Sequence, residues 1–172
     1  FSMNSLDSTK NQITQLLQSK VIENQLTAIS HIRQAGDKFL LEQMLELLIL
    51  TSNKDVEREI LRCLCDIKDN SMLPIIIESC KNPRFKSKKQ SILHCLWQTN
   101  FDMHAYIDYF ISLILTESFE IGIEALTLIE VTAENLNNDE KKTYIELLNR
   151  ELNGTDAPQI KSLLIQAIEI LS

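Results

Sequence analysis

The stretch VEREILRCLCDI (residues 56–67) decides the fold, because its pattern of apolar residues recurs along the chain. Two apolar residues are followed by a spacer, then by a small or apolar residue and a further apolar one, which is helical spacing. The pattern returns at intervals of 32–39 residues in NQLTAISHI (24–32), VEREILRCLCDI (56–67), KKQSILHCLWQT (88–99), IGIEALTLIEV (121–131) and IKSLLIQAIEI (160–170). A repeat of this length predicts stacked antiparallel helix pairs, since one pair alone buries too little apolar surface.

Helices are expected along the whole chain. Glycine and proline number only three each, and sheets need turns in which these residues are common. Apolar residues recur at helical spacing between short polar joints, and no stretch is a convincing strand. The expected helices are 5–19, 22–34, 38–51, 55–68, 71–82, 86–99, 103–116, 119–135, 139–153 and 157–171.

The joints between these helices carry residues suited to helix ends. The glycines expected in the left-handed conformation just after a helix are Gly36 and Gly154. The residues expected to cap or open a helix are Asn53, Asp55, Pro74, Ser87 and Pro158. These signals predict loops of two to four residues.

The repeated residues resemble HEAT repeats, in which an acidic or turn residue precedes Val-Arg and an apolar series. Asp55-Val56 with Ile60–Leu64 matches that pattern, as does Pro158 with Ile160-Lys161. The chain departs from it where Glu57 and Gly122 replace the usual Arg, and where Lys88 replaces the usual Val. The resemblance implies an all-α, right-handed α-α superhelix of about five helix pairs. It implies one domain over 1–172, with capping helices at 1–20 and 157–172.

Charge and composition exclude several function classes. The net charge is −7, which argues against general affinity for nucleic acid or anionic membranes. No apolar run is long enough to span a bilayer, and no secretory signal is visible. The four cysteines are expected to be reduced, in a cytoplasmic protein. From the opening FSM, without an initial Met, we expect either the remnant of an added tag or a domain excised from a larger protein.

Motifs for catalysis or metal binding are not recognisable. Cys63-x-Cys65 lacks zinc-ligand spacing, and Cys63 and Cys95 occupy a place that other repeats fill with small or apolar residues. His104 shares a helix face with Asp108 but belongs to no metal-like series. Glycine-rich phosphate loops and nucleophile elbows are absent from the sequence. We expect no cofactor, no metal and no enzymatic activity.

The HEAT-like family consists mostly of protein-binding scaffolds, whose second helices line the concave face. The resemblance therefore implies a scaffold or adaptor that binds a peptide or partner helix there. The polar residues expected on this lining are Glu42, Glu46, Glu78, Asp108, Ser112, Glu146 and Arg150. Acids dominate its first part, so the expected partner has basic character.

A basic patch interrupts this acidic chain at Lys81, Arg84, Lys86, Lys88 and Lys89. It is expected in a solvated turn between two repeats, with its charge available to an acidic partner. It could also pair with the acidic segment 117–140, in the same molecule or by self-association. The alternatives that the resemblance leaves open are a nucleic-acid-binding protein like the HEAT-like DNA glycosylases, and a HEAT-like lyase or enzyme accessory subunit.

Overall fold

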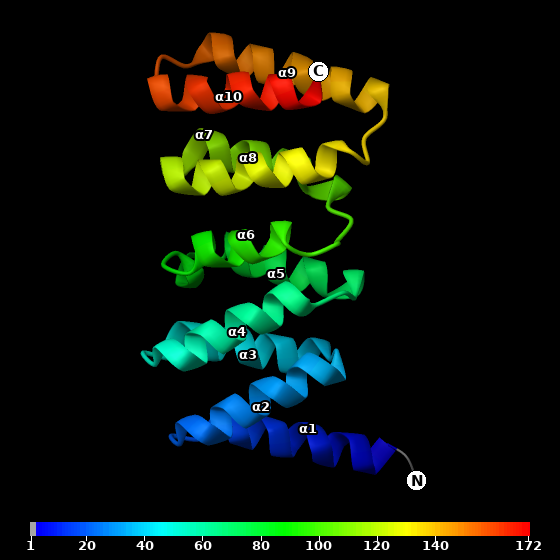
Figure 1. Ribbon diagram of the computed structural model, residues 1–172, viewed down its shortest axis with the longest axis vertical. Helices are drawn as coiled ribbons and strands as arrows, with labels where there is room; N and C mark the ends of the chain where they lie inside the picture. Colours follow the sequence, from blue (N-terminus) through cyan, green and yellow to red (C-terminus); the bar gives the residue numbers. More distant parts are fainter. Residues whose placement is uncertain (1–2) are drawn as a thin grey trace. The chain divides into compact units, whose positions relative to one another are not determined.

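The computed structural model describes the backbone of residues 3–172 and the side chains of residues 6–172. All regular structure within residues 3–172 is helical, which confirms the all-α prediction (Figure 1). The ten expected ranges correspond to α1 (Met3–Leu17), α2 (Ile22–Ala35), α3 (Lys38–Leu50), α4 (Lys54–Asp66), α5 (Leu73–Lys81), α6 (Lys89–Trp97), α7 (Ile107–Thr116), α8 (Phe119–Ala133), α9 (Asn138–Gly154) and α10 (Pro158–Leu171).

Three predicted helices begin later than expected, because a short 3-10 turn precedes each of them. These turns are η1 (Asn70–Met72), η2 (Pro83–Phe85) and η3 (His104–Tyr106). Pro74 lies in the first turn of α5, as predicted, where its missing N–H removes no helical bond. At η2, the side chain of Asn82 accepts a hydrogen bond from the N–H of Arg84, which holds the turn closed.

Some predicted helix ends are confirmed and others are wrong. Asn53 caps α4, with its side-chain oxygen accepting from the backbone N–H of Asp55 and of Val56. Gly36 follows α2 with φ 59°, the left-handed conformation expected of it. Gly154 is instead the last residue of α9, without a positive φ. The prediction for Ser87 is also wrong, because Lys88 is the N-cap of α6 and makes no side-chain cap.

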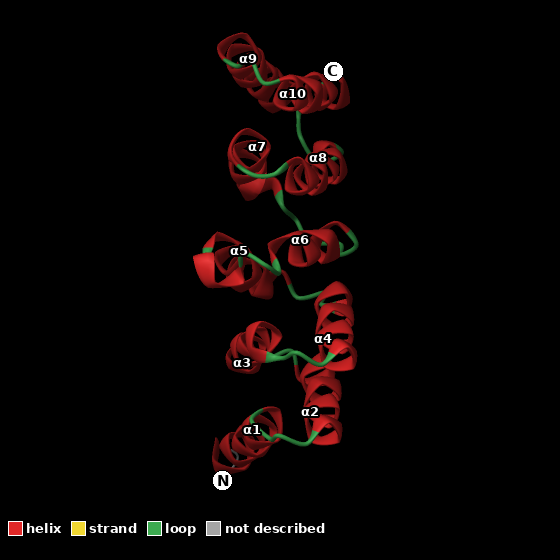
Figure 2. Ribbon diagram, turned by 90° about the vertical axis from the view of Figure 1, so that its left-hand side faces the viewer, coloured by secondary structure: helices red, strands yellow, loops and turns green. Residues whose placement is uncertain are grey.

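The chain divides into two compact units, of which the first extends to Phe101. Within this unit the helices form two layers (Figure 2). In one layer α3 packs between α1 and α5, and in the other α4 packs between α2 and α6. Successive helices therefore alternate between the layers, so that the core lies between α1, α3 and α5 on one side and α2, α4 and α6 on the other.

The second unit begins at Asp102. Here α8 packs against both α7 and α10, and α9 packs along α10. The contact between α8 and α10 depends on a glycine, because a Cβ on Gly122 would lie 2.6 Å from Leu163 Cδ1. A larger residue at this position would force Leu163 to move.

In the repeated pattern, the small or apolar residue that follows the spacer is buried in all five helices. These residues are Ala28, Cys63, Cys95, Leu128 and Ala167, none more than 4% exposed. Cys63 and Cys95 are therefore core residues, as predicted. Burial raises the pKa of the Cys63 thiol to about 11, so this cysteine is protonated and unreactive near neutral pH.

Candidate functional site: a groove between α3 and α5

Three of the residues predicted to line the inner face meet in one groove of the first unit. Glu42 and Glu46 come from α3, and Glu78 comes from α5. The groove has a volume of about 360 Å³ and is open to solvent. Its remaining lining residues are Leu45, Pro74, Ile75, Ser79, Asn82 and Phe85.

The floor of the groove is apolar, although its rim is charged. Leu45 and Phe85 are 3% and 4% exposed, and Ile75 is half-buried. The one hydroxyl of the floor, Ser79 Oγ, donates a 2.6 Å hydrogen bond to the carbonyl of Ile76 within α5. Because this polar group is satisfied internally, the floor favours apolar side chains.

The rim carboxylates differ in how they are neutralised. Arg84 donates from Nη1 and Nη2 to Oε1 and Oε2 of Glu46, both at 2.8 Å, across 38 residues of sequence. This bidentate pair raises the pKa of the Arg84 guanidinium, chiefly through its hydrogen bonds. Glu78 Oε1 lies 3.1 Å from Lys81 Nζ on its own helix. The carboxylate of Glu42 is exposed, and the Glu78–Lys81 pair is exposed to solvent and therefore weak, so a partner would meet mainly these two carboxylates.

The other four predicted lining residues lie in the second unit. Ser112 on α7 donates to the carbonyl of Tyr109 at 2.6 Å, so its hydroxyl is satisfied by its own helix. Asp108 contributes to the raised pKa of Tyr144 on α9, after the larger effect of burial. Glu146 and Arg150 are exposed on α9, where Arg150 lies 4.0 Å from Glu151. The seven residues thus form two sets, and the set from the first unit lines the groove.

Three residues of the basic patch form ion pairs with carboxylates of the first unit. Besides Arg84 and Lys81, Lys88 Nζ lies 2.8 Å from Glu57 Oε1 on α4. Both side chains of that pair are only 16% exposed, while Lys86 is exposed and Lys89 half-buried. Three of the five basic side chains are paired with carboxylates, so the excess charge expected from the sequence is much smaller.

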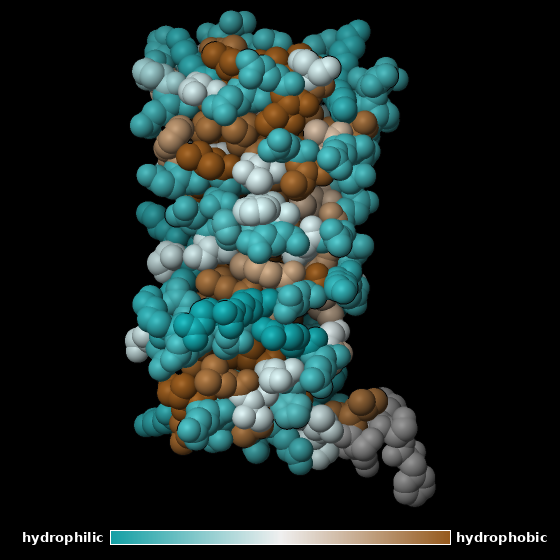
Figure 3. Space-filling view, in the orientation of Figure 1, coloured by the Kyte–Doolittle hydropathy of each residue, from teal (hydrophilic) through white to brown (hydrophobic). Residues whose placement is uncertain are grey.

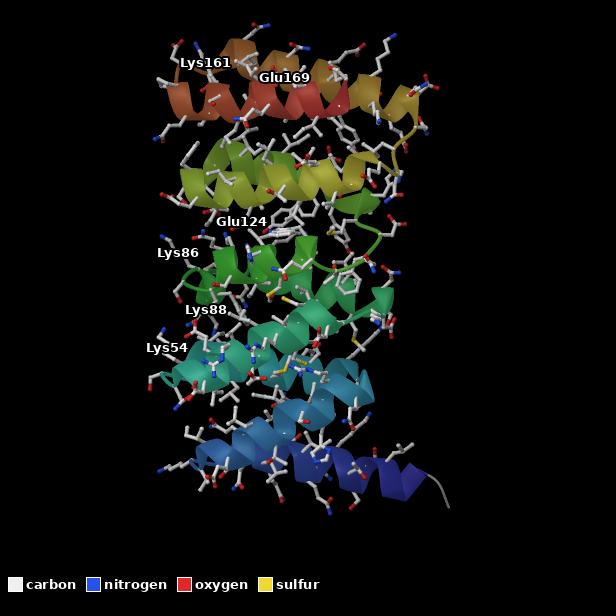
Figure 4. All side chains as sticks on the ribbon, viewed as in Figure 1. Lys54, Lys86, Lys88, Glu124, Lys161 and Glu169 are labelled. Atoms are coloured by element: carbon white, nitrogen blue, oxygen red, sulfur yellow. The ribbon has the colours of Figure 1, made fainter. Side chains whose placement is uncertain are left out.

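Glu57 forms ion pairs that the sequence did not predict. Lys54 Nζ also approaches it, at 3.0 Å, and Figure 4 shows Lys54 and Lys88 projecting at the same edge of α4 and α6. Hydrogen bonds from Lys88 and then from Lys54 hold the pKa of this carboxyl below its usual range. The signal was present, because Glu57 and Lys88 are both departures from the HEAT pattern and carry opposite charges.

His104 has a different neighbour from the one its sequence position suggested. Its Nε2 lies 2.7 Å from Oε1 of Glu140, at the start of α9. The other oxygen of Glu140 accepts from the N–H of Asn137 at 2.9 Å, and the Asn137 side chain accepts from the N–H of Glu140. His104 therefore braces a capping box in the second unit.

The opposite layer of the first unit presents a different surface. Figure 3 shows the face formed by α2, α4 and α6, with hydrophilic residues gathered over α4. Their charges pair along the helix, Arg58 with Asp55 and Arg62 with Glu59, both at 2.7 Å. The groove with Leu45 and Phe85 in its floor and glutamates at its rim lies on the α3–α5 side.

None of the helices within residues 3–172 has the length and apolar character needed to cross a bilayer. Comparison with models of known protein families finds no match to this chain, and a search of curated proteins likewise finds no match. What the chain does must therefore be argued from its residues and their geometry.

Proposed function

We propose that this chain is a protein-interaction module, and that a basic amphipathic segment of a partner docks in the α3–α5 groove. The observation that carries the proposal is the groove itself, with an apolar floor at Leu45, Ile75 and Phe85 and exposed carboxylates at Glu42 and Glu78. Apolar side chains of the partner would cover the floor, and its Lys or Arg side chains would face the rim. Such helix-in-groove recognition is common among protein-binding modules.

The proposal also covers the arrangement of the helix pairs, which the sequence suggests. We propose that the helix pairs continue as a HEAT-like, right-handed superhelix and that the α1, α3 and α5 layer belongs to its concave face. The two-layer packing of the first unit supports this arrangement. Cys63 and Cys80 are thiols buried in the core, which supports a reducing and hence cytoplasmic setting.

The test is a peptide-display screen against the whole chain. Enriched peptides are expected to combine Lys or Arg with large apolar residues at helical spacing. The double variant Glu42→Lys, Glu78→Lys should bind them about tenfold more weakly, because both exposed attractions become repulsions. Binding is measured by fluorescence anisotropy, and raising the salt concentration should weaken the wild-type complex.

The matched control is the double variant Glu23→Lys, Glu130→Lys, which changes the net charge equally at exposed positions outside the groove. It should keep wild-type affinity if the groove is the site. Equal weakening in both double variants would show a general charge effect and contradict the proposal. Circular dichroism checks that each variant keeps its helices.

A further inference from the structure

A second groove lies on the other side of α3, between it and α1. Its volume is about 540 Å³. Leu17 and Leu47 form its buried floor, and Leu50 is 74% exposed, more than any other large apolar side chain that the structure describes in the first unit. The other lining residues are Gln18, Ser19, Lys20, Gln25, Gln43, Glu46 and Thr51.

The two grooves adjoin, because Glu46 lines both of them. On α3, Glu42 and Leu45 face the first groove, and the stripe Gln43, Leu47 and Leu50 faces the second. With about 3.6 residues per turn, these are neighbouring stripes of one helix that meet along Glu46. A partner that fills the first groove and continues over α3 therefore enters the second.

The chemistry of the second groove differs from that of the first. Its rim consists of amides, hydroxyls and Lys20, and its sole carboxylate is Glu46, which Arg84 already neutralises. Lys20 would repel a cationic side chain, whereas Leu50 offers an exposed apolar contact. This groove suits an apolar or uncharged segment.

We infer that the partner segment is bipartite, with a basic amphipathic half in the α3–α5 groove and an adjoining uncharged apolar half in the α1–α3 groove, anchored on Leu50. This inference rests on the proposed function, and it adds that the basic half and the apolar half of the partner segment adjoin. A helix with its side chains is about 10 Å wide. Crossing α3 therefore takes roughly three extended residues.

The experiment compares two synthetic peptides that bind the whole chain. The first is a basic amphipathic peptide of Lys and Leu at helical spacing. The second carries the same sequence followed by Ser-Gly-Ser and a Leu-Ser-Phe-Leu extension. Linking the two halves should tighten binding by about tenfold or more over the basic peptide, as measured by fluorescence anisotropy.

The variant Leu50→Ser should remove most of this gain and leave affinity for the basic peptide unchanged. Phe39→Ser is the matched control, since Phe39 is also an exposed apolar residue of α3, at 47%, and lines neither groove. It should keep the gain. If the basic peptide binds and the extension adds nothing, the bipartite inference is overturned while the proposed function stands. If neither peptide binds, the proposed function itself fails.

Discussion

At the scale of single residues, the departures from the repeat pattern turn out to be the most informative positions. Glu57 and Lys88 lie about thirty residues apart and meet at 2.8 Å with most of each side chain covered. A half-buried ion pair contributes little net stability when both partners are present, but removing one partner exposes the other to the cost of desolvation. The pair therefore restricts which residues are tolerated at either place.

Replacing Lys88 with Met should lower the free energy of unfolding by about 1–2 kcal/mol, since Glu57 would keep only the more exposed Lys54. Urea denaturation of Lys88→Met, Glu57→Gln and the double variant measures the coupling between the two residues. The control Arg58→Met breaks the exposed pair with Asp55 and should cost less than about 0.5 kcal/mol. A coupling energy near zero would contradict a specific interaction between Glu57 and Lys88.

At the scale of secondary-structure elements, some of the local sequence signals for helix ends have the expected effect and others do not. The sequence predicted the same role for Gly36 and Gly154, since each follows a stretch with helical spacing of apolar residues. Only Gly36 adopts the left-handed conformation, with its N–H donating to the carbonyl of Ile32. At Gly154 the helix simply continues to its last residue, and Thr155 follows in an extended conformation.

These two glycines offer a matched test of backbone conformation. A Cβ at either position would meet no atom within 4 Å, so steric packing does not distinguish them. Gly36→Ala should lower the free energy of unfolding by about 1 kcal/mol, because L-residues are strained at positive φ. Gly154→Ala should be neutral or stabilise by up to about 1 kcal/mol, since alanine favours a helix. Thermal and urea denaturation measure both, and equal effects would refute the assignment.

At the scale of the whole molecule, several carboxyl groups link stability to pH. Burial raises the pKa of Asp37, but the hydrogen bonds from Lys10 and from the backbone N–H groups of Leu40 and Phe39, together with the charge of Lys10, lower it more, so that it lies below its usual 3.8. The backbone N–H of Ser71 likewise lowers the pKa of Asp69, and Lys88 and Lys54 lower that of Glu57 from 4.5. Each group is therefore more acidic in the folded state than in the unfolded chain.

The free energy of unfolding should consequently fall as pH decreases from about 5 to 3. The contribution of each carboxylate is present above its unfolded pKa and is lost as pH drops through the lower folded value. Urea denaturation at a series of pH values measures this slope. Asp37→Asn should be less stable at neutral pH and should show a shallower decline, whereas an unchanged slope would exclude Asp37 as a contributor.

The amino-acid sequence by itself determined the all-α class, the positions of ten helices and the burial of the small or apolar residue that follows the spacer in each repeat. It could do so because helix periodicity, proline placement and capping act over a few neighbouring residues. Through the resemblance to HEAT repeats it also nominated Glu42, Glu46 and Glu78, together with four residues that lie in the second unit. It misplaced three helix starts, where short 3-10 turns compete with the α-helix over single hydrogen bonds.

Only the tertiary structure decided how charge is distributed over the surface. Arg84 reaches Glu46 across 38 residues, and Lys88 reaches Glu57 from the next helix of its layer, so a basic patch becomes a set of ion pairs. The same packing sets Leu45, Ile75 and Phe85 beneath two exposed carboxylates and leaves Leu50 uncovered beside α1. Such contacts depend on which helices pack together. Local sequence patterns do not show which side chains, distant in the sequence, come within reach of one another.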